Sequence, residues 1–408
     1  MKLLFVCGVS EKNGELTAAS WISGIIASLD EEVELFSPAS RANDGSKALK
    51  IHDKSIRVIP FSLSEGADSL SSKLKQAAAD AIIIFGTESA YALPVIGACE
   101  KAGILGRTAL FAQGMAYACA KHYSEGVPGS VRRRGTLRDI LRRSNINTEQ
   151  RRMAEKAKSE RLAIKKTRHF IGRTTLDEAV LRMYNPYAAY YKCNDILRAC
   201  FYEGAWSYES CEKHRIFVSQ YYYPLKGFHY LLEAAAALRE KYPDMRIAAA
   251  GYNPIQKSVL QNELKDSSYI RYIKSLINKY GLGDNIELLG ELSAERMKEE
   301  YLKANVFVLP STIENSPNSL AEAMALGTPT VASDVGGVTD FALHKSEAYI
   351  YPSSAPYMLS YYIDKIFGDI EDAGRISANG RLRALREYDR EANIRALKNA
   401  FISIAQKS

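Results

Sequence analysis

The chain has little cysteine, and its cysteines follow no recognised spacing. The 408 residues include six cysteines with no C-x-x-C pair and no zinc-type pattern. This argues against a disulfide framework or a cysteine-rich metal site and indicates reduced thiols in a cytoplasmic protein. No apolar run reaches the roughly 18 residues that a membrane-spanning helix needs. The opening MKLLFVCGVS turns polar by Ser10, so it predicts a buried strand and not a secretion signal.

Low-complexity tracts are absent as well, which argues against extensive disorder. Hydrophobic residues make up 47% of the chain and charged residues 25%, as in ordinary globular proteins. A chain of 408 residues exceeds what one hydrophobic core usually organises. We therefore expect two domains.

Positive charge is concentrated in one segment. Residues 131–168, called the basic segment below, contain 14 Lys or Arg against four acidic residues, a net charge of +10, whereas the whole chain carries +7. Leu137, Ile140 and Leu141 recur there at helical intervals, which predicts basic helices with a narrow apolar side. Such a surface suits anionic lipid headgroups or a phosphate-bearing substrate. The alternative is a solvated pair of charged helices; no nucleic-acid partner is expected, because interleaved aromatic residues and known motifs are missing.

Short apolar runs alternate with helical patterns through both halves of the chain. Strand-like runs occur at residues 2–9, 32–38, 55–62, 80–88 and 107–114, and again at 215–220, 246–251, 285–290, 306–311 and 328–334. Continuous hydrophobic strands predict parallel sheets covered on both faces, hence the α/β class with two doubly wound, Rossmann-like domains. The polar stretch 202–214 marks the joint. We expect domains over 1–205 and 206–385, and a C-terminal helix over 386–408 that packs back toward the first domain.

A polar turn follows the predicted strand at 306–311. Ser316 is expected to cap a helix that has Pro317 at its first position and ends at Gly327. Free N–H groups and the positive end of the helix dipole make such a terminus a phosphate site. Glu314 precedes it and Glu322 lies about two turns inside, where side chains lean back toward the N-terminus. Both acids are expected to hold hydroxyl groups of a ligand whose phosphates sit between them.

Residues 216–340 resemble the nucleotide-sugar-binding half of family-four glycosyltransferases. The stretch ENSPNSLAE has the family's spacing of a Glu, seven residues and a Glu, and YYYPLKGF resembles its Lys-Gly at a helix start. The resemblance implies the GT-B fold, in which two Rossmann-like domains face a central cleft, and retaining sugar transfer. It assigns donor binding to residues 206–385 and acceptor binding to residues 1–205.

The resemblance also implies roles for single residues. Glu314 would contact the donor sugar, Glu322 the ribose hydroxyls, and Lys226 the pyrophosphate. Glu314 and His122, which follows another predicted strand, are the expected catalytic residues. The expected donor-binding residues are Lys226, Glu322, Gly14, Ser316, Pro317, Asn318, Ser319, Leu320, Gly251, Tyr252 and Leu292. Tyr221 stands where the family often has Arg, which leaves the second phosphate ligand open.

The expected reaction uses no metal and no cofactor. The sequence has no D-x-D triplet, the metal clamp of the other main glycosyltransferase fold. Residues 171–202, with YYYPLKG, are similar to the enzymes that build bacterial capsule and other surface polysaccharides. This implies a nucleotide-sugar donor and a glycan acceptor, typically linked to a lipid pyrophosphate. The expected location is the cytoplasm or the inner face of the cytoplasmic membrane, bound through residues 131–168 to anionic lipid.

Two other functions remain open at this point. A sugar-nucleotide epimerase of the same fold would need a further acid and base around the sugar, and the motifs fit transfer better. A catalytically silent sugar-nucleotide-binding subunit is the second alternative, because Tyr221 removes a usual phosphate contact. The donor sugar, the base, the acceptor and the linkage are not set by the sequence.

Overall fold

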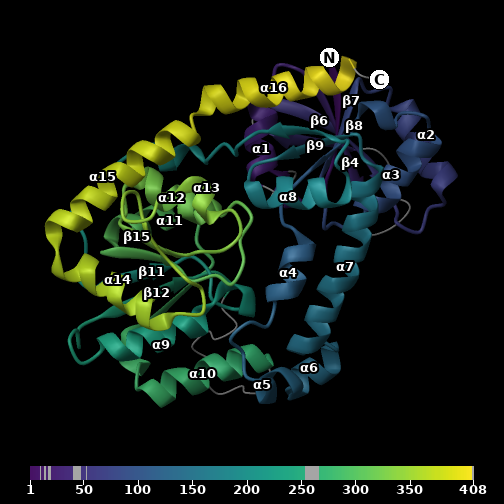
Figure 1. The fold of residues 1–408 in the computed structure, drawn as a ribbon. Coiled ribbons are helices and arrows are strands. Elements are labelled where there is room, and N and C mark those ends of the chain that lie inside the picture. Colours follow the sequence, from purple (N-terminus) through teal and green to yellow (C-terminus); the bar gives the residue numbers. More distant parts are fainter. Residues whose placement is uncertain are drawn as a thin grey trace. The chain divides into compact units, whose positions relative to one another are not determined.

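Residues 1–9, 11–12, 15–16, 20–39, 47–51, 53–252 and 266–406 are described by a computed structural model (Figure 1). One unit comprises Met1–Tyr117, Glu155–Leu197 and Tyr388–Ser408, and the second comprises Ala118–Ala154 and Arg198–Glu387. The sequence-based boundary at residue 205 differs from this division, because residues 118–154 and 198–205 belong to the second unit. Gly14, expected to bind the donor, lies outside the described residues.

The first unit is built on a ten-stranded sheet with the order β10-β9-β8-β7-β1-β4-β6-β5-β3-β2. The seven strands from β10 to β6 run parallel, while β5 pairs antiparallel with β6 and β2 with β3. Phe5 of β1 lies opposite Leu35 and Ile83, and β1 and β7 are buried along almost their whole length, as expected for central strands covered on both faces. The strands are β1 (Lys2–Val6), β2 (Glu11–Lys12), β3 (Glu15–Leu16), β4 (Glu32–Pro38), β5 (Lys47–Ile51), β6 (Lys54–Phe61), β7 (Ala81–Phe85), β8 (Thr108–Phe111), β9 (His169–Gly172) and β10 (Ala189–Lys192).

Helices of the first unit include the C-terminal one. The helix expected over 386–408 is α16 (Arg390–Gln406), and its Phe401 packs against Phe5 with ring centroids 5.8 Å apart. The other helices are α1 (Ser20–Ala27), α2 (Ala67–Gln76), α3 (Ala92–Lys101), η1 (Leu105–Arg107) and α8 (Thr175–Tyr184), and α4 (Ala116–His122) and α7 (Ile146–Lys166) continue from one unit into the other.

The second unit contains a six-stranded, wholly parallel sheet with the order β13-β12-β11-β14-β15-β16. The order reverses between β11 and β14, and an open α/β sheet binds ligands outside the carboxyl ends of the strands at that point. The predicted fold class is therefore confirmed for this unit. The strands are β11 (Arg215–Val218), β12 (Arg246–Ala250), β13 (Ile286–Gly290), β14 (Val306–Leu309), β15 (Thr330–Ser333) and β16 (Tyr349–Tyr351).

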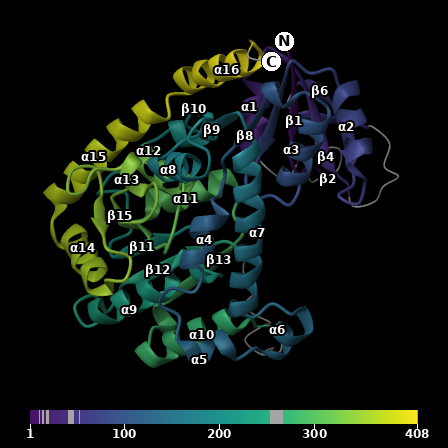
Figure 2. The same ribbon diagram turned by 45° about the vertical axis from the view of Figure 1, so that its right-hand side comes forward.

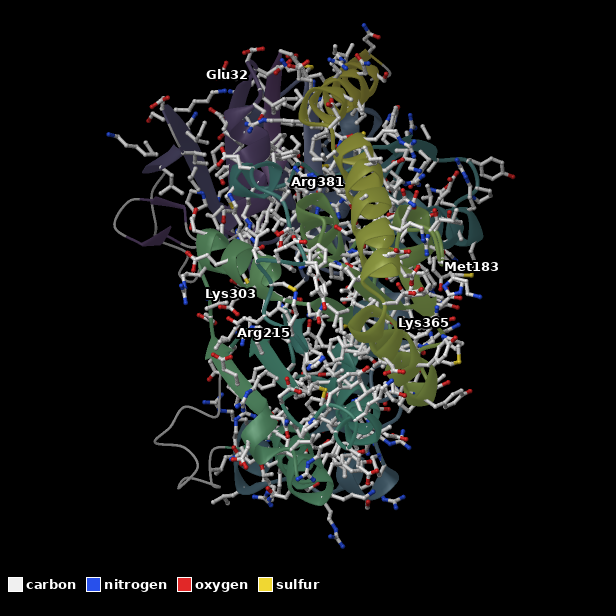
Figure 3. All side chains as sticks on the ribbon, turned by 90° about the vertical axis from the view of Figure 1, so that its left-hand side faces the viewer. Glu32, Met183, Arg215, Lys303, Lys365 and Arg381 are labelled. Carbon is white, nitrogen blue, oxygen red and sulfur yellow. The ribbon has the colours of Figure 1, made fainter. Side chains whose placement is uncertain are left out.

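Arg215, at the amino end of β11, makes a buried ion pair with Glu300 and a partly exposed one with Glu287. The guanidinium of Arg215 contacts Glu287 of β13 at 2.8 Å and Glu300 at 2.6 Å, and Figure 3 labels Arg215 together with Lys303 at the end of α11. The helices of the second unit are α5 (Gly129–Arg133), α6 (Leu137–Arg142), η2 (Ala199–Tyr202), η3 (Pro224–Lys226), α9 (Phe228–Leu238), α10 (Ser268–Tyr280), η5 (Gly283–Asn285), α11 (Ala294–Lys303), α12 (Asn318–Leu326), α13 (Val338–Phe341), α14 (Pro356–Gly368) and α15 (Ile370–Glu387).

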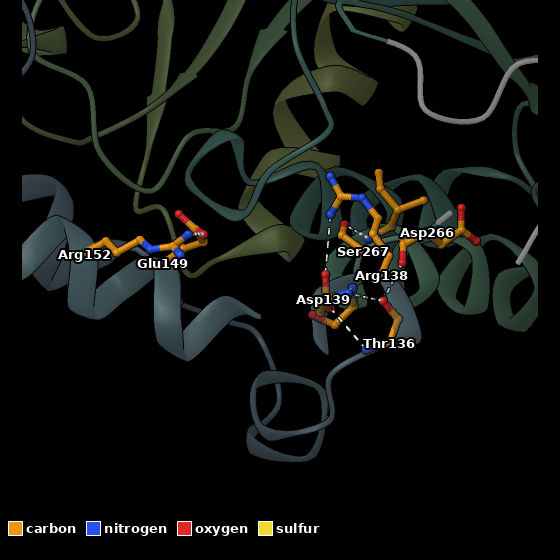
Figure 4. Close-up of polar contacts among 9 residues, drawn as sticks. Thr136, Arg138, Asp139, Glu149, Arg152, Asp266 and Ser267 are labelled. Carbon is orange, nitrogen blue, oxygen red and sulfur yellow. Dashed lines mark hydrogen bonds and ion pairs between the residues drawn. The ribbon is translucent and has the colours of Figure 1, made fainter. Parts of the chain in front are cut away.

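The basic segment divides between the two units, since its residues 131–154 belong to the second. Thr136 caps α6, and its hydroxyl donates to the carbonyl of Asp266 at 2.6 Å. Asp139 accepts from the backbone N–H of Ser268 at 2.8 Å (Figure 4). Helices α5 and α10 also lie side by side in Figures 1 and 2. These buried contacts tie residues 136–139 to the start of α10 in the second unit, whereas the sequence predicts them in a domain over 1–205.

The apolar side of α6 is exposed. Leu137, Ile140 and Leu141 are 51%, 66% and 77% exposed. The helical spacing predicted for these residues is found, but it does not bury them. No helix in the described part of the chain combines the length and the apolarity needed to span a membrane.

Candidate functional site

The site lies where the loops after β11 and β14 meet, at the point where the strand order reverses. The loop after β11 leads into η3, which ends at Lys226, and the loop after β14 carries Glu314. The Nζ atom of Lys226 lies 2.6 Å from Oε1 of Glu314. The hydroxyl of Ser311 donates to the same Glu314 oxygen at 2.7 Å. The structure thus brings together two of the residues predicted from the sequence.

Gly227 allows the two loops to approach. Its φ is 62°, and a Cβ atom there would lie 1.8 Å from the carbonyl oxygen of Pro310. Only glycine combines the left-handed conformation with so close a backbone contact. The N–H of Thr312 also donates to the carbonyl of Leu225 at 2.8 Å. The Lys-Gly pair therefore places the lysine beside the end of β14.

Lys226 is held as a cation. Burial lowers the pKa of Lys226, but Glu314 and Tyr223 together raise it above its ordinary value. Burial raises the pKa of Tyr223 to about 12, although Lys226 counteracts this. A buried ammonium beside one carboxylate can contact a further anion on its free side.

The N-terminus of α12 carries buried polar atoms without a partner among the described residues. Pro317 occupies the N-cap position and makes no side-chain capping bond, so the prediction that Ser316 caps the helix is wrong. Within the described residues, Ser316 Oγ and Asn318 Oδ1 are buried without a hydrogen-bond partner. Buried polar atoms without a hydrogen-bond partner are rare, and water or a ligand usually supplies the partner. Ser319 and Leu320 complete the first turn, and the N–H of Leu320 donates to the carbonyl of Pro317 at 3.0 Å. The N–H groups before it, at the start of the turn, suit a phosphate.

Glu322 lies deeper in α12 and already has partners. Its side chain accepts from Arg198 at 2.8 Å and from the Tyr301 hydroxyl at 3.3 Å. Burial raises the pKa of Glu322, while Arg198 opposes the rise. Arg198 could not be predicted from the sequence, because it precedes the predicted joint and no spacing links it to residue 322.

His122 lies at the end of α4, in the second unit. Its carbonyl accepts from the Thr312 hydroxyl at 3.1 Å, two residues before Glu314. Its half-exposed ring faces Glu125, with Nδ1 2.6 Å from Oε2. The backbone of His122 thus joins the site, and its imidazole is oriented by a carboxylate.

The other predicted donor residues lie at neighbouring strand ends. Gly251 follows β12 with a φ of 108° and donates to the carbonyl of Gly290 at 2.8 Å. Tyr252 is exposed and packs edge-on against Tyr222, 5.8 Å between centroids, and Leu292 is partly buried after β13. These positions line the same edge of the sheet as Lys226.

Tyr221 supplies no charge to the site. It is buried in the core, with its ring 5.5 Å from that of Phe228. Arg198 is a cation that binds Glu322. Glu322 belongs to α12, the helix whose N-terminus suits a phosphate. Across the ranges that the structure describes, no cluster of three or more His, Cys, Asp or Glu residues has the arrangement of a metal site.

Comparison with known proteins matches this unit to a family. Residues 209–383 match the model of glycosyl transferases group 1. An uncharacterized glycosyltransferase of Methanocaldococcus jannaschii is 28% identical over 159 residues, which is 39% of this chain and 36% of that protein. The chain thus matches well under half the length of that relative.

Solved structures share the fold of the whole chain. The sucrose-phosphate synthase of Thermosynechococcus elongatus superposes with a TM-score of 0.71, at 16% identity, over 100% of both chains. Anabaena HepE, solved in complex with UDP and glucose, gives 0.69 at 15% identity, over 99% of this chain and 100% of that one. Residues 209–383 are thus similar to the group 1 glycosyl transferases, and the chain has the two Rossmann-like domains of the GT-B fold.

Proposed function

We propose that the protein transfers a sugar from a nucleotide-sugar donor to a hydroxyl group of a glycan. The observation that carries the proposal is the Lys226–Glu314 pair at the strand-order reversal, 2.6 Å apart. It lies beside a helix terminus with unpartnered polar atoms, within the residues that are similar to the group 1 glycosyl transferases. A cation, a carboxylate and a free helix terminus together suit a ligand with both phosphates and hydroxyl groups.

The donor would bind across these groups. The first turn of α12 and Lys226 take the diphosphate, Glu314 takes sugar hydroxyls, and Glu322 takes ribose hydroxyls. HepE was solved with UDP and UDP-glucose, which supports a nucleoside diphosphate sugar as the donor class here. Binding of the ribose would have to share Glu322 with Arg198.

Transfer would follow from electrostatic stabilisation of the leaving diphosphate. Negative charge grows on the phosphate oxygen as the bond to the sugar breaks, and Lys226 with the helix N–H groups stabilises it where it develops. We propose same-face attack, with the leaving phosphate taking the acceptor proton, so the anomeric configuration is retained. Glu314 then positions the sugar and needs no covalent bond to it. We propose that no metal takes part.

The acceptor is proposed to be a lipid-linked glycan of a surface polysaccharide. The basic segment supports this proposal through its net charge of +10. Arg142 and Arg143, both exposed, follow the exposed Leu137, Ile140 and Leu141 at the end of α6. Arginines around an exposed apolar tip suit an anionic membrane surface, and we propose the inner face of the cytoplasmic membrane as its place of action.

Incubation of the protein with single nucleotide sugars in water tests the donor side. We expect slow release of the nucleoside diphosphate and the free sugar from one donor, and the same rate with EDTA. Formation of an epimerised nucleotide sugar would favour the epimerase alternative. Binding without any release or transfer would favour a silent subunit, and a rate restored only by added Mg²⁺ or Mn²⁺ would contradict metal independence.

A further inference from the structure

A cavity of about 240 Å³ in the second unit lies beside the groups proposed to bind the diphosphate and the sugar, and it shares Tyr252 with the residues expected to bind the donor. Five tyrosines contribute to its lining, and we call it the tyrosine pocket: Tyr123, Tyr222, Tyr223, Tyr252 and Tyr269. Pockets for drug-sized ligands measure roughly 300–1,000 Å³. The tyrosine pocket is smaller and suits a ligand of one ring.

Aromatic faces dominate the lining. Tyr222 packs at 4.9 Å from Tyr223 and 5.8 Å from Tyr252, measured between ring centroids. Tyr269 extends the lining from α10, and Tyr123 from the stretch after α4. A tyrosine presents a flat apolar face beside a hydroxyl group, which matches a ligand with apolar C–H faces and polar edges.

Two hydroxyl groups in the lining lack partners. Ser268 is 5% exposed, and its Oγ has no hydrogen-bond partner within the described residues. The Oγ of Ser144 is likewise buried and unpartnered there. Arg138 and Glu149 add a cation and a carboxylate to the lining, and Figure 4 shows both side chains. Apolar surface with a few polar groups is typical of a small-molecule site.

The frame around these groups is fixed by buried hydrogen bonds. Thr136 binds the carbonyl of Asp266 at 2.6 Å, and Asp139 binds the N–H of Ser268 at 2.8 Å (Figure 4). Arg138 lies between Thr136 and Asp139 in the sequence, and its guanidinium contacts the Asp139 carboxylate at 3.5 Å. The pocket is thus held between α6 and α10 before any ligand binds, which lowers the entropy cost of binding.

The pocket adjoins the donor site. Tyr223 lines it, and the Nζ atom of Lys226 lies 5.7 Å from the centre of the Tyr223 ring. A ligand in the pocket would therefore lie close to the group that is proposed to bind the diphosphate.

We infer that the tyrosine pocket binds a sugar ring of the acceptor glycan; the acceptor role rests on the proposed function. Hydroxyl groups of the sugar form hydrogen bonds with the Oγ atoms of Ser144 and Ser268, and the apolar face of the sugar packs on a tyrosine ring. Stretch 118–154, which supplies Tyr123, Arg138, Ser144 and Glu149, would then provide acceptor recognition on the unit that holds the donor.

Saturation-transfer NMR on the full chain tests the inference. The probes are methyl glycosides of common hexoses and N-acetylhexosamines, with and without saturating UDP. We expect signal from at least one glycoside, and we expect it to persist when UDP is present. Ser144→Leu fills the pocket and should abolish the signal, as should Arg138→Gln. Arg142→Gln removes the same charge from the same helix outside the pocket and should keep it.

Each outcome is decisive. Loss of the glycoside signal on adding UDP would show a nucleotide site and overturn the inference, as would the absence of signal from every glycoside. Signal retained in a Ser144→Leu variant that unfolds at the wild-type temperature would overturn it too, and if that variant does not fold, Arg138→Gln decides. If wild-type protein binds a glycoside but never cleaves a nucleotide sugar, the proposed function fails and the sugar pocket stands.

Discussion

The Nζ atom of Lys226 lies 2.6 Å from Oε1 of Glu314, although 88 positions separate the two residues in the chain. Two loops from the neighbouring strands β11 and β14 create this pair. The ammonium neutralises the carboxylate, and a bound diphosphate would share the same cation. The site therefore keeps a mostly buried charge compensated before the donor arrives.

Gly227→Ala should disrupt the approach of the two loops. The new Cβ would lie 1.8 Å from the Pro310 carbonyl oxygen. Gly103→Ala is the matched control, because Gly103 also has a positive φ, 72°, but nothing within 4 Å of the added atom. The left-handed conformation alone costs about 1–2 kcal/mol. Chemical denaturation should show a clearly larger loss of unfolding free energy at Gly227, and equal losses would contradict the crowding argument.

Arg198→Ala should destabilise the protein more at pH 7.5 than at pH 5. Burial raises the pKa of Glu322 and Arg198 opposes this, so removing the cation raises the pKa further. The folded state then binds this proton more tightly than the unfolded chain does, and stability is lost as pH rises through the folded pKa. Arg198 is partly exposed, so solvent screening limits the cost to about 1–3 kcal/mol.

The double variant Arg198→Ala/Glu322→Gln is the control for this effect. The double variant lacks the uncompensated carboxylate, so it should recover most of the unfolding free energy that Arg198→Ala loses at pH 7.5. Urea titrations at both pH values measure it. A loss from Arg198→Ala that is independent of pH would show that packing, and not charge, dominates.

Glu160 in the first unit should make stability fall with rising pH. Burial raises the pKa of Glu160 from 4.5 to about 7, although its carboxylate accepts from Thr87 at 2.6 Å and from two backbone N–H groups. The folded state therefore binds more protons between these pH values, and its advantage is lost as pH rises through about 7. Across this window the effect is up to about 3 kcal/mol.

Glu160→Gln should flatten the dependence of unfolding free energy on pH between 4.5 and about 7. Glu155→Gln, on the exposed side of the same helix α7, should leave that dependence unchanged. An unaltered slope in Glu160→Gln would mean that this carboxyl group titrates as in the unfolded chain.

Membrane binding should depend on the charge of the basic segment. Each Lys or Arg near an anionic surface contributes about 1 kcal/mol, and salt screens this attraction. We expect co-sedimentation with anionic vesicles at low ionic strength, release at high salt and no binding to neutral vesicles. Reversal of Arg132, Arg133, Arg142 and Arg143 to Glu should abolish binding. Unchanged binding of that variant would leave a solvated surface as the better description.

Much of the fold could be predicted from the sequence because its strands are continuous apolar runs. The Glu314 loop and the Lys226 turn could be identified, since a strand end and a helix start are local patterns. Their direct contact could not, because it depends on the order of β11 and β14 in the sheet. Arg198 could not be predicted for the same reason, as its partner Glu322 is distant in the chain.

The division into units was harder to predict. Stretch 118–154 follows strands of the first sheet but packs on α10 through Thr136 and Asp139. Thr136 and Asp139 cap α6 through a pattern of neighbouring residues, which can be recognised in the sequence. The same two side chains also contact the start of α10, and these contacts depend on the tertiary structure. The cap of α12 was also misassigned, because Ser-Pro fits a helix start in more than one register.

Cleavage of the donor by Lys226→Met and Glu314→Gln variants tests the central claim most directly. Once the donor panel has identified a cleaved nucleotide sugar, the rate of nucleoside diphosphate release is measured for both variants and for Lys213→Met as a control away from the site. Loss of one group that stabilises developing charge typically slows a reaction roughly 100- to 1,000-fold. We predict a loss of this size for Lys226→Met, a loss for Glu314→Gln and a wild-type rate for Lys213→Met. Wild-type rates in folded Lys226→Met and Glu314→Gln proteins would contradict the assignment of this pair as the donor site.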